Sequence, residues 1–337
     1  MKRVNDLYDI CCRDDNLYQA YLTARKGKRS KRNCFAFERN LGTNLLQLGA
    51  ELRSGAYRPQ PYFSFIIHEA KPRLIQAPAF RDTVAQHAFY RHIYPLFDRR
   101  FIATSFACRV GKGTHACADY VQTAMRQSAR DSYTLHLDVR RFFYSINRDL
   151  LRGLLARVIK DERLLAAMMQ YADQEEPLGI PIGNLLSQLF ALVYLNPVDH
   201  FVKRELRIQH YARYVDDLVL IGLTRQDAED AQTAVAEYLS TRLELTLSKS
   251  RLAPIHHGLN FVGYRTWASR RFVRRRSLHL FGRRLRCART ANRHDLDSLN
   301  SLMGHARHTS THRHYCRRIT CERPDLIPYL PHYEARS

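Results

Sequence analysis

The chain has 337 residues, 45% of them hydrophobic, and carries 54 Lys and Arg against 32 Asp and Glu, a formal net charge of +22. This length allows a large core in two or three subdomains. No run approaches the ~20 apolar residues of a membrane span, and the early acidic residues of MKRVNDLYDICCRDD argue against a secretory signal. We therefore expect a cytoplasmic protein without a membrane partner, whose partner is a polyanion such as nucleic acid.

The first part of the chain predicts helices and one hairpin. Residues 1–33 form a polar, basic segment that includes RKGKRSKR, and we expect it to be partly mobile. Leucines at helical spacing predict a helix over 35–54 that Gly55 ends. YFSFII followed by KPRLIQAP is typical of two strands joined by a turn. Further helices are predicted over DTVAQHAFYRHIYPLF, closing near Pro95, and over residues 115–129.

The rest of the chain predicts a sheet and more helices. TLHLD (134–138) is a short strand, and an apolar periodicity predicts a helix over 149–172. LLSQLFALVYLNPVDHFVKREL predicts a long helix that has to tolerate its proline. YARYVDDLVLIG precedes a helix over 226–243, the strand-like LELTL and NFVGYRTW, and a basic, helical C-terminal region. This order favours an α+β fold with helices on one face of the sheet.

Two adjacent aspartates, Asp216 and Asp217, interrupt a strand-like run in YARYVDDLVLIG. Adjacent strand residues point to opposite faces, so both carboxylates can serve one site only at a sharp turn. The flanking runs 211–215 and 218–222 predict a hairpin with VDD at its tip. Two bare carboxylates there would repel each other, whereas a divalent metal such as Mg²⁺ would keep both ionised. Alternatively, the aspartates are turn formers.

A third carboxylate is expected at another strand end, and TLHLD supplies Asp138. Three carboxylates around two metal ions are suited to phosphoryl transfer, in which the ions activate the attacking oxygen and stabilise the leaving one. We expect two Mg²⁺ ions, with Mn²⁺ as an alternative ion.

The eight cysteines contain no CxxC pair, which indicates reduced thiols. One segment, HARHTSTHRHYCRRITC (305–321), is rich in histidine and cysteine. Its spacing matches none of the standard zinc pairs. A basic surface is the expectation there, with a metal site as the alternative.

Taken together, LHLDVRRFFYSI, LGIPIGNLLSQ and YVDD resemble, in this order, the palm motifs of reverse transcriptases. KPRLIQAPAFRD resembles their fingers motif and GLNFVGYR their primer grip. The resemblance covers roughly residues 60–310. It implies a right-hand polymerase that adds deoxynucleotides to a primer on an RNA template. The implied segments are a basic N-terminal stretch (1–33), fingers with part of the palm (34–133), palm (134–268), and a basic thumb and tail (269–337).

The resemblance also implies roles for individual residues. Asp138 and Asp216 coordinate the metals, Asp217 assists, and Val139 lends a backbone carbonyl. Phe143 is the aromatic gate that excludes a 2′-hydroxyl, although it or Phe142 could simply pack. The implied triphosphate-binding cations are Lys71 and Arg73. Lys249 is implied to protonate the leaving pyrophosphate, unless it is only a surface lysine. The implied primer grip consists of Phe261, Gly263 and Tyr264, although the two aromatic residues are equally compatible with packing in a strand.

The loop GIPIGNLLSQ carries the most specific resemblance. Gly179 and Gly183 permit a close approach to a nucleotide. Most reverse transcriptases have Gln at the position of Ile182 and Pro at that of Gln188, and these departures resemble the reverse transcriptases of diversity-generating retroelements. Ile182 offers only apolar contact, so a polar discrimination term of ~1–3 kcal/mol is lost. This predicts loose copying of template adenines.

That branch implies a bacterial or phage-encoded enzyme for mutagenic retrohoming, with a template-repeat RNA, primer or cDNA, deoxynucleoside triphosphates and an accessory variability protein as partners. The alternatives are a retron or group II intron-type enzyme, which differs in template and not in chemistry, and an inactive RNA-binding protein with a polymerase fold. All three aspartates are present, which argues against the inactive protein.

Overall fold

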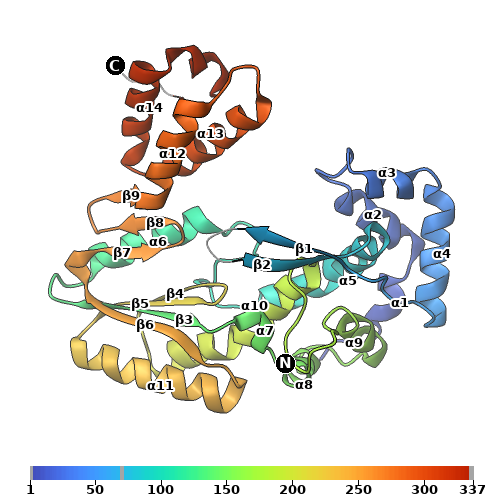
Figure 1. Ribbon diagram of the computed structural model, residues 1–337. Helices are drawn as coiled ribbons and strands as arrows, with labels where there is room; N and C mark the ends of the chain where they lie inside the picture. The colour runs from blue at the N-terminus through green and yellow to red at the C-terminus, as the bar shows by residue number, and fades with distance from the viewer. Residues whose placement is uncertain (1–2, 69–71, 334–337) are drawn as a thin grey trace. The chain divides into compact units, whose positions relative to one another are not determined.

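The computed structural model describes residues 3–68 and 72–333 (Figure 1). Two compact units are present, each assembled from three stretches of chain. Unit 1 contains the chain up to Ala103, then 138–206 and 233–249; unit 2 contains 104–137, 207–232 and 250 onward. Since each unit combines stretches far apart in sequence, the expected division into consecutive N-terminal, fingers, palm and thumb segments stays a prediction.

The N-terminal part of unit 1 is a packed helical layer. Asn16 lies inside it, and its side-chain amide donates to the carbonyls of Cys11 and Ala88 at 2.8 and 3.1 Å. The helices before residue 33 are packed and bury Tyr8 and Leu17, while the partial mobility of this stretch stays a prediction. The helices are α1 (Leu7–Cys11), α2 (Asp14–Ala24), α3 (Arg32–Glu38), α4 (Leu41–Ser54) and α5 (Phe80–Asp98).

Two of the predicted helices are divided in the structure, and a third is present as predicted. The helix expected over 35–54 is divided into α3 and α4, although Gly55, at φ 75°, does end it. The helix predicted over DTVAQHAFYRHIYPLF is present as α5, which contains Pro95 and ends at Asp98, near the predicted end. The helix expected over 149–172 is two helices, α8 (Arg148–Ala156) and α9 (Glu162–Met169).

The break between α8 and α9 has a tertiary cause. The backbone N–H of Val4 donates to the carbonyl of Val158 at 2.9 Å, and the N–H of Lys160 donates to the carbonyl of Val4 at 2.7 Å. Asp161 then caps α9 by accepting from the N–H of Leu164 at 3.1 Å. The bonds of Val158 and Lys160 with Val4 take the place of hydrogen bonds within a continuous helix. Val4 lies more than 150 residues before them in the sequence.

Helix α10 (Leu185–His200) runs into a π-helical turn, η1 (Phe201–Glu205), and contains Pro197 as expected. Residues 185–205 are the one described helical span long and apolar enough to cross a membrane, and 67% of that window is buried inside the protein. Such burial is typical of a core helix.

The predicted hairpin is present as β1 (Phe63–His68) and β2 (Pro72–Ala77), antiparallel with Phe65 opposite Ile75. Every residue of β1 is exposed, including Phe63 at 72% and Ile66 at 56%. The hairpin therefore offers apolar side chains to solvent instead of packing them.

Unit 2 contains most of a four-stranded sheet in the order β4-β5-β3-β6. Helix α6 (Thr114–Gln127) packs on β4 and β5, where Val121, Ala212 and Val219 share one apolar cluster. The strand expected over LELTL (243–247) lies further along the chain, since β6 begins at Leu247. The strands are β3 (Tyr133–Val139), β4 (His210–Tyr214), β5 (Asp217–Leu223) and β6 (Leu247–Pro254); helix α11 (Arg225–Leu243) lies between β5 and β6 in sequence.

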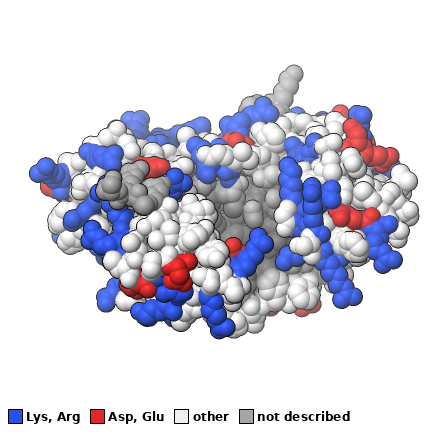
Figure 2. All heavy atoms as spheres, turned by 90° about the horizontal axis from the view of Figure 1, so that it is seen from above, with Lys and Arg blue, Asp and Glu red and all other residues white. Residues whose placement is uncertain are grey.

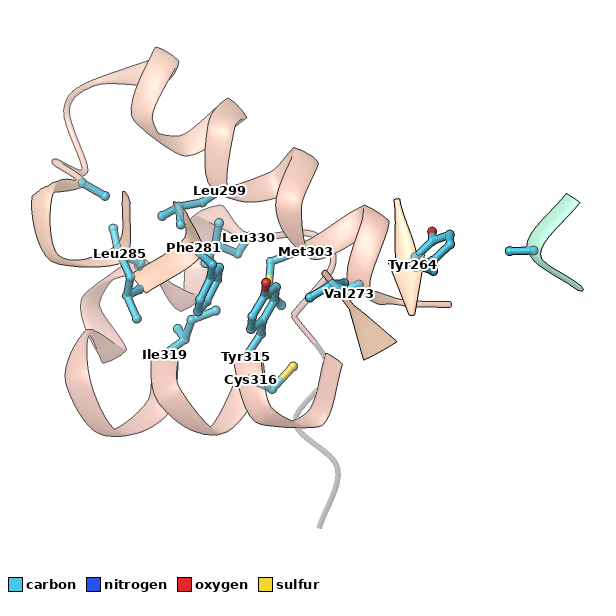
Figure 3. Close-up of a cluster of buried hydrophobic side chains, with 14 residues drawn as sticks. Tyr264, Val273, Phe281, Leu285, Leu299, Met303, Tyr315, Cys316, Ile319 and Leu330 are labelled. Atoms are coloured by element: carbon cyan, nitrogen blue, oxygen red, sulfur yellow. The ribbon is translucent and has the colours of Figure 1, made fainter. Parts of the chain in front are cut away.

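The C-terminal part of unit 2 joins a small sheet to three helices. NFVGYRTW forms a hairpin instead of one strand, with Phe261 opposite Tyr264. In the helical core, the rings of Phe281 and Tyr315 stack with centroids 3.6 Å apart (Figure 3). The elements are β7 (Leu259–Phe261), β8 (Tyr264–Thr266), β9 (Arg271–Val273), α12 (Arg275–Cys287), α13 (Arg293–Ala306), α14 (Thr311–Glu322) and the short 3-10 turns η2 (Ile255–His257) and η3 (Pro324–Tyr329).

The surface is basic, as the composition predicts. Lys and Arg spread over the face shown in Figure 2, whereas Asp and Glu form a few small groups. All eight cysteines are free. Among the described residues, no group of three or more His, Cys, Asp or Glu is placed to hold a metal ion, so the metal alternative for 305–321 gains no support there.

Candidate active site

The turn of the β4–β5 hairpin holds the paired aspartates. Tyr214 pairs with Asp217, which leaves Val215 and Asp216 as the two-residue turn. Val215 has φ 56°, a left-handed conformation that is strained for a β-branched residue. The guanidinium of Arg213 is fully buried and donates to the carbonyl of Val215 at 3.0 Å. This bond stabilises the turn and thereby the position of Asp216.

Asp217 begins β5 and keeps 38% of its side chain exposed. Its Oδ1 lies 2.9 Å from Nε2 of His136 on β3. The ring of His136 in turn rests edge-on against Phe261, with centroids 5.6 Å apart. His136 therefore orients Asp217. Sequence reasoning missed His136; its place two residues before Asp138 in a strand was the available signal.

Asp138 lies near the end of β3, the strand next to β5 in the sheet order. Because strand side chains alternate, Asp138 shares a face of β3 with His136. The hydroxyl of Ser248 donates to the Asp138 carboxylate. The following Val139 has a buried side chain, so only its backbone is left to serve a ligand.

The segment after Asp138 turns into a short helix, α7 (Phe142–Ser145), which separates the two candidate gate residues. Phe142 is buried and packs with the half-buried Phe143 at 5.4 Å between centroids. The backbone of Phe143 is tied to the next loop, because its carbonyl accepts from the N–H of Ile180 at 2.8 Å. Phe142 is thus a core residue, and Phe143 is the one with exposed ring surface.

The loop 179–184 is pressed between α7 and β2. A Cβ on Gly179 would lie 3.0 Å from Cα of Tyr144, and one on Gly183 would lie 3.1 Å from the carbonyl oxygen of Gln76. The carbonyl of Ile182 accepts from the N–H of Gln76 at 2.7 Å. Both glycines have positive φ, 94° and 124°. They are therefore required by contacts within the protein, before any nucleotide is considered.

Two side chains cap the helix that follows this loop. Asn184 Oδ1 accepts from the N–H of Ser187 at 2.7 Å. Gln86, fully buried on α5, accepts through Oε1 from the N–H groups of Leu185 and Leu186 at 2.9 and 3.2 Å. Three of the four N–H groups that a helix start leaves unpaired thus have partners. No local pattern pointed to Gln86, because it lies 99 residues before Leu185 in the sequence.

A buried polar network anchors the same loop on its other side. The Tyr57 hydroxyl donates to Asp82 Oδ1 at 2.6 Å and lies 2.5 Å from the Tyr171 hydroxyl. Asn184 donates to the Tyr171 carbonyl at 3.3 Å. Burial raises the pKa of the Asp82 carboxyl above its usual range, and hydrogen bonds from Tyr57 and the backbone of Gln60 oppose that rise. The network fixes the loop to α5 through groups that no solvent can reach.

The other predicted residues are distributed as follows. Arg73 is exposed on β2, Gln188 on the first turn of α10 and Lys249 on β6; Lys71 lies outside the described residues. Phe261 and Tyr264 are 1% and 0% exposed, so their rings belong to the core. Only the turn between them, Val262 and Gly263, is left to meet a ligand.

Comparison with known proteins gives matches in sequence and in structure. The family model "Reverse transcriptase (RNA-dependent DNA polymerase)" matches residues 67–266, more than half of the chain. The chain is 23% identical over 272 residues to protein YkfC of Escherichia coli (strain K12), covering 67% of this chain and 71% of YkfC. It is 25% identical over 214 residues to the group II intron-encoded protein LtrA of Lactococcus lactis, covering 58% of this chain and 35% of LtrA.

Among solved structures, the chain is similar to telomerase from Candida albicans in complex with a fragment of telomeric RNA. The TM-score is 0.48 at 11% identity, and the match covers 81% of this chain and 56% of the telomerase chain. The chain therefore spans about a third of LtrA and a little over half of that telomerase chain.

Replacing Gln86 tests the buried cap. Gln86→Leu removes the acceptor of two N–H groups at a buried helix start, and we expect a loss of about 1–3 kcal/mol in the free energy of unfolding. Urea denaturation followed by circular dichroism measures it. Gln226→Leu, at an exposed position of α11, is the control and should change stability by less than about 0.5 kcal/mol. Equal losses in the two variants would contradict the cap.

Replacing Arg213 tests whether its hydrogen bond to the Val215 carbonyl stabilises the turn. Arg213→Met keeps an apolar stem of similar length but leaves the Val215 carbonyl without this donor, so we expect faster amide hydrogen exchange across residues 210–223. Mass spectrometry of peptides from that segment measures the exchange. Arg251→Met, on the exposed part of β6, should leave the exchange of 210–223 unchanged. Unchanged amide hydrogen exchange of residues 210–223 in Arg213→Met would refute this stabilising role of Arg213.

Proposed function

Since the family model spans residues 67–266, this chain belongs to the reverse transcriptase family of RNA-directed DNA polymerases, and we propose that it is the polymerase of a diversity-generating retroelement. It copies a template-repeat RNA into cDNA with errors concentrated at adenines, for diversification of a target gene by mutagenic retrohoming. The observation that carries this proposal is the loop with Ile182 and Gln188. Its amino-acid sequence resembles that branch, and contacts within the protein hold its backbone.

Asp138, Asp216 and Asp217 would offer carboxylate oxygens and Val139 a backbone carbonyl, and oxygen donors of this kind suit Mg²⁺. The described residues do not gather the three aspartates into a ready metal-binding group, so their chemistry and not their placement supports this assignment. Two such ions, when bound there, would supply Lewis-acid activation of the primer hydroxyl and stabilisation of the pyrophosphate oxygens. The same carboxylates have protein partners: His136 orients Asp217, and Ser248 donates to Asp138.

Selection of the sugar is assigned to Phe143. Its ring is half buried, it leans on the buried Phe142, and its carbonyl holds Ile180 of the nucleotide loop. A ring supported in this way cannot easily withdraw, so a 2′-hydroxyl would clash with it. The proposed product is therefore DNA.

We assign the neutralisation of negative charge on the triphosphate to basic residues. Arg73, exposed on β2, and Lys71 would neutralise the β- and γ-phosphates of the incoming nucleotide. Lys249, exposed on β6 directly after Ser248, would give a proton to leaving pyrophosphate.

Template and primer are held mainly through their phosphates. The net charge of +22 and the basic surface in Figure 2 support strongly salt-dependent binding. We assign the accessory variability protein as a partner that shares this RNA, and a bacterial or phage-infected cytoplasm as the location. A retron or group II intron-type enzyme is the second candidate, favoured by the likeness to LtrA. Sequencing of cDNA made from the adjacent genomic repeat separates the two, since only the retroelement enzyme is expected to make adenine-biased errors.

Loss of one carboxylate tests the metal assignment. Asp216→Asn, Asp217→Asn and Asp138→Asn each remove a ligand charge, and we expect kcat for primer extension on poly-rA/oligo-dT with Mg²⁺ to fall at least ~100-fold for Asp138 and Asp216 and less for Asp217. Asp230→Asn, at an exposed position of α11, is the matched control and should retain full activity. Activity equal to wild type in Asp216→Asn would reject the assignment.

A second substitution tests the fidelity assignment. Ile182→Gln restores a polar contact of ~1–3 kcal/mol, so misincorporation opposite template adenine should fall by about 5- to 150-fold. Deep sequencing of cDNA from a defined RNA measures it. Leu178→Gln, 44% exposed in the same loop region, is the control and should keep the wild-type error rate. An error rate at adenine that Ile182→Gln leaves unchanged removes Ile182 as the cause of loose copying.

A further inference from the structure

A groove of about 890 Å³ lies between three helices of unit 1. It is lined by α8, by the end of α10 with the turn η1, and by the C-terminal half of α11. None of the described residues predicted to bind metal, nucleotide or primer lines it. Pockets that hold small ligands have volumes of about 300–1,000 Å³, and packed helices are one of the places where they form.

Helix α10 changes its geometry where it borders the groove. Pro197 lines the groove and has no N–H to give to the helix. The helix then widens into η1, where the N–H of Leu206 donates to the carbonyl of Phe201 at 3.1 Å. Such π-helical turns are rare and occur frequently at functional sites. Phe201, the first residue of the turn, lines the groove and stacks on Tyr238 of α11 with ring centroids 4.3 Å apart.

Helix α8 leaves the groove open at Gly153. This residue lies in the interior of the helix, where glycine is less favourable than alanine. Outside its own helix, an added Cβ would have no heavy atom within 4 Å, so packing does not require the glycine. Because Gly153 lines the groove, its missing side chain leaves room for a ligand.

Two arginines that line the groove have no partner in the protein. Arg157 follows α8 and Arg242 lies in the last turn of α11, and both are exposed. In the described chain neither guanidinium forms an ion pair or a hydrogen bond, whereas Arg152, also on α8, pairs with Glu162. Burial raises the pKa of the Tyr238 hydroxyl and both guanidiniums oppose that rise, which places their charges beside the aromatic pair. They are therefore available to bind an anion there.

Together, the groups of the groove match the three parts of a nucleoside phosphate. The aromatic pair and an apolar floor that includes Leu154 suit a base, since bases pack against aromatic side chains. Guanidinium groups bind phosphate through paired hydrogen bonds. Glu205 and Glu237 also line the groove, and their carboxylates can accept hydrogen bonds from sugar hydroxyls. An inorganic anion would use only the arginines, and an apolar ligand only the rings and the floor.

We propose that this groove binds a nucleoside phosphate, with its phosphate on Arg157 and Arg242 and its base against Phe201 and Tyr238. The site is separate from the polymerase site. It goes beyond the proposed function, which does not require it. A free nucleotide and the 5′-phosphorylated end of an RNA strand offer the same base, sugar and phosphate, so both belong to the ligand class.

The test measures the binding of AMP to the full chain by isothermal titration calorimetry, at physiological ionic strength and with EDTA. Both sources contain the AMP group, so binding is expected in either case. Its Kd should be at least ~10-fold lower than that of inorganic phosphate, because only AMP reaches the aromatic pair. If AMP does not bind, or if inorganic phosphate binds as tightly, the proposal is overturned.

Gly153→Leu fills the groove without removing a contact. We expect the Kd for AMP to rise at least ~10-fold. The melting temperature from circular dichroism should not fall, because leucine favours a helix more than glycine does. Gly42→Leu is the matched control, since Gly42 lies in α4 and an added Cβ there also has no heavy atom within 4 Å. It should keep the wild-type Kd, and a folded Gly153→Leu protein that also keeps it contradicts the site.

A second pair of variants separates specific binding from general attraction to a basic surface. The double variant Arg157→Gln with Arg242→Gln loses both phosphate contacts, so its Kd for AMP should rise at least ~10-fold. Arg152→Gln with Arg204→Gln removes the same charge from exposed residues of α8 and η1 that do not line the groove, and should keep the wild-type Kd. An equal loss of affinity in both double variants would overturn the proposal.

A competition experiment identifies the source of the ligand. A short RNA with a 5′-phosphate and the same RNA with a 5′-hydroxyl are each added to protein loaded with labelled AMP. Displacement by the phosphorylated RNA alone supports an RNA end as the ligand, and displacement by neither RNA supports a free nucleotide. Equal displacement by both RNAs would overturn the assignment of a terminal phosphate to Arg157 and Arg242.

Discussion

The left-handed backbone of Val215 is the constraint on which the candidate site depends. In an unbroken strand, the side chains of neighbouring residues point to opposite faces, so Asp216 and Asp217 could not serve one site. The two-residue turn solves this problem by placing Asp216 at the apex and Asp217 at the start of β5. A β-branched residue at φ 56° costs about 1–3 kcal/mol, and a buried guanidinium and the hairpin ladder hold it there.

The same kind of strain recurs near other predicted site residues. Of the seven non-glycine residues with positive φ in the described chain, Arg141 follows the Asp138 strand and Val262 lies in the β7–β8 turn. In each case a specific contact is close by: the carbonyl of Arg141 accepts from the N–H of Tyr144 in α7, and the carbonyl of Gly263, next to Val262, accepts from the N–H of Arg274 at 3.3 Å. Three of the seven strained residues, Arg141, Val215 and Val262, thus lie in segments that carry predicted site residues.

Local patterns in the sequence predicted the hairpins, the positions of the aspartates and most helices. They failed where a distant partner decides the local structure. The break before α9 depends on Val4, and the cap of α10 depends on Gln86, neither of which belongs to a pattern around the affected helix. Period-two alternation also could not tell whether Phe261 and Tyr264 face a ligand or a core, because α6 and α13, which bury them, are separate in sequence.

The loop 179–184 contains some residues whose identity is fixed by contacts within the protein and one whose contact does not depend on its side chain. Gly179, Gly183 and Asn184 are fixed by close contacts and capping, so evolution has little freedom at those positions. Ile182 binds β2 through its backbone carbonyl, a group that every amino acid possesses. Its side chain can therefore be exchanged by mutation without loss of this hydrogen bond. Under the proposed function, single-codon changes at this position would then alter the copying error rate while the backbone contact of the loop is kept.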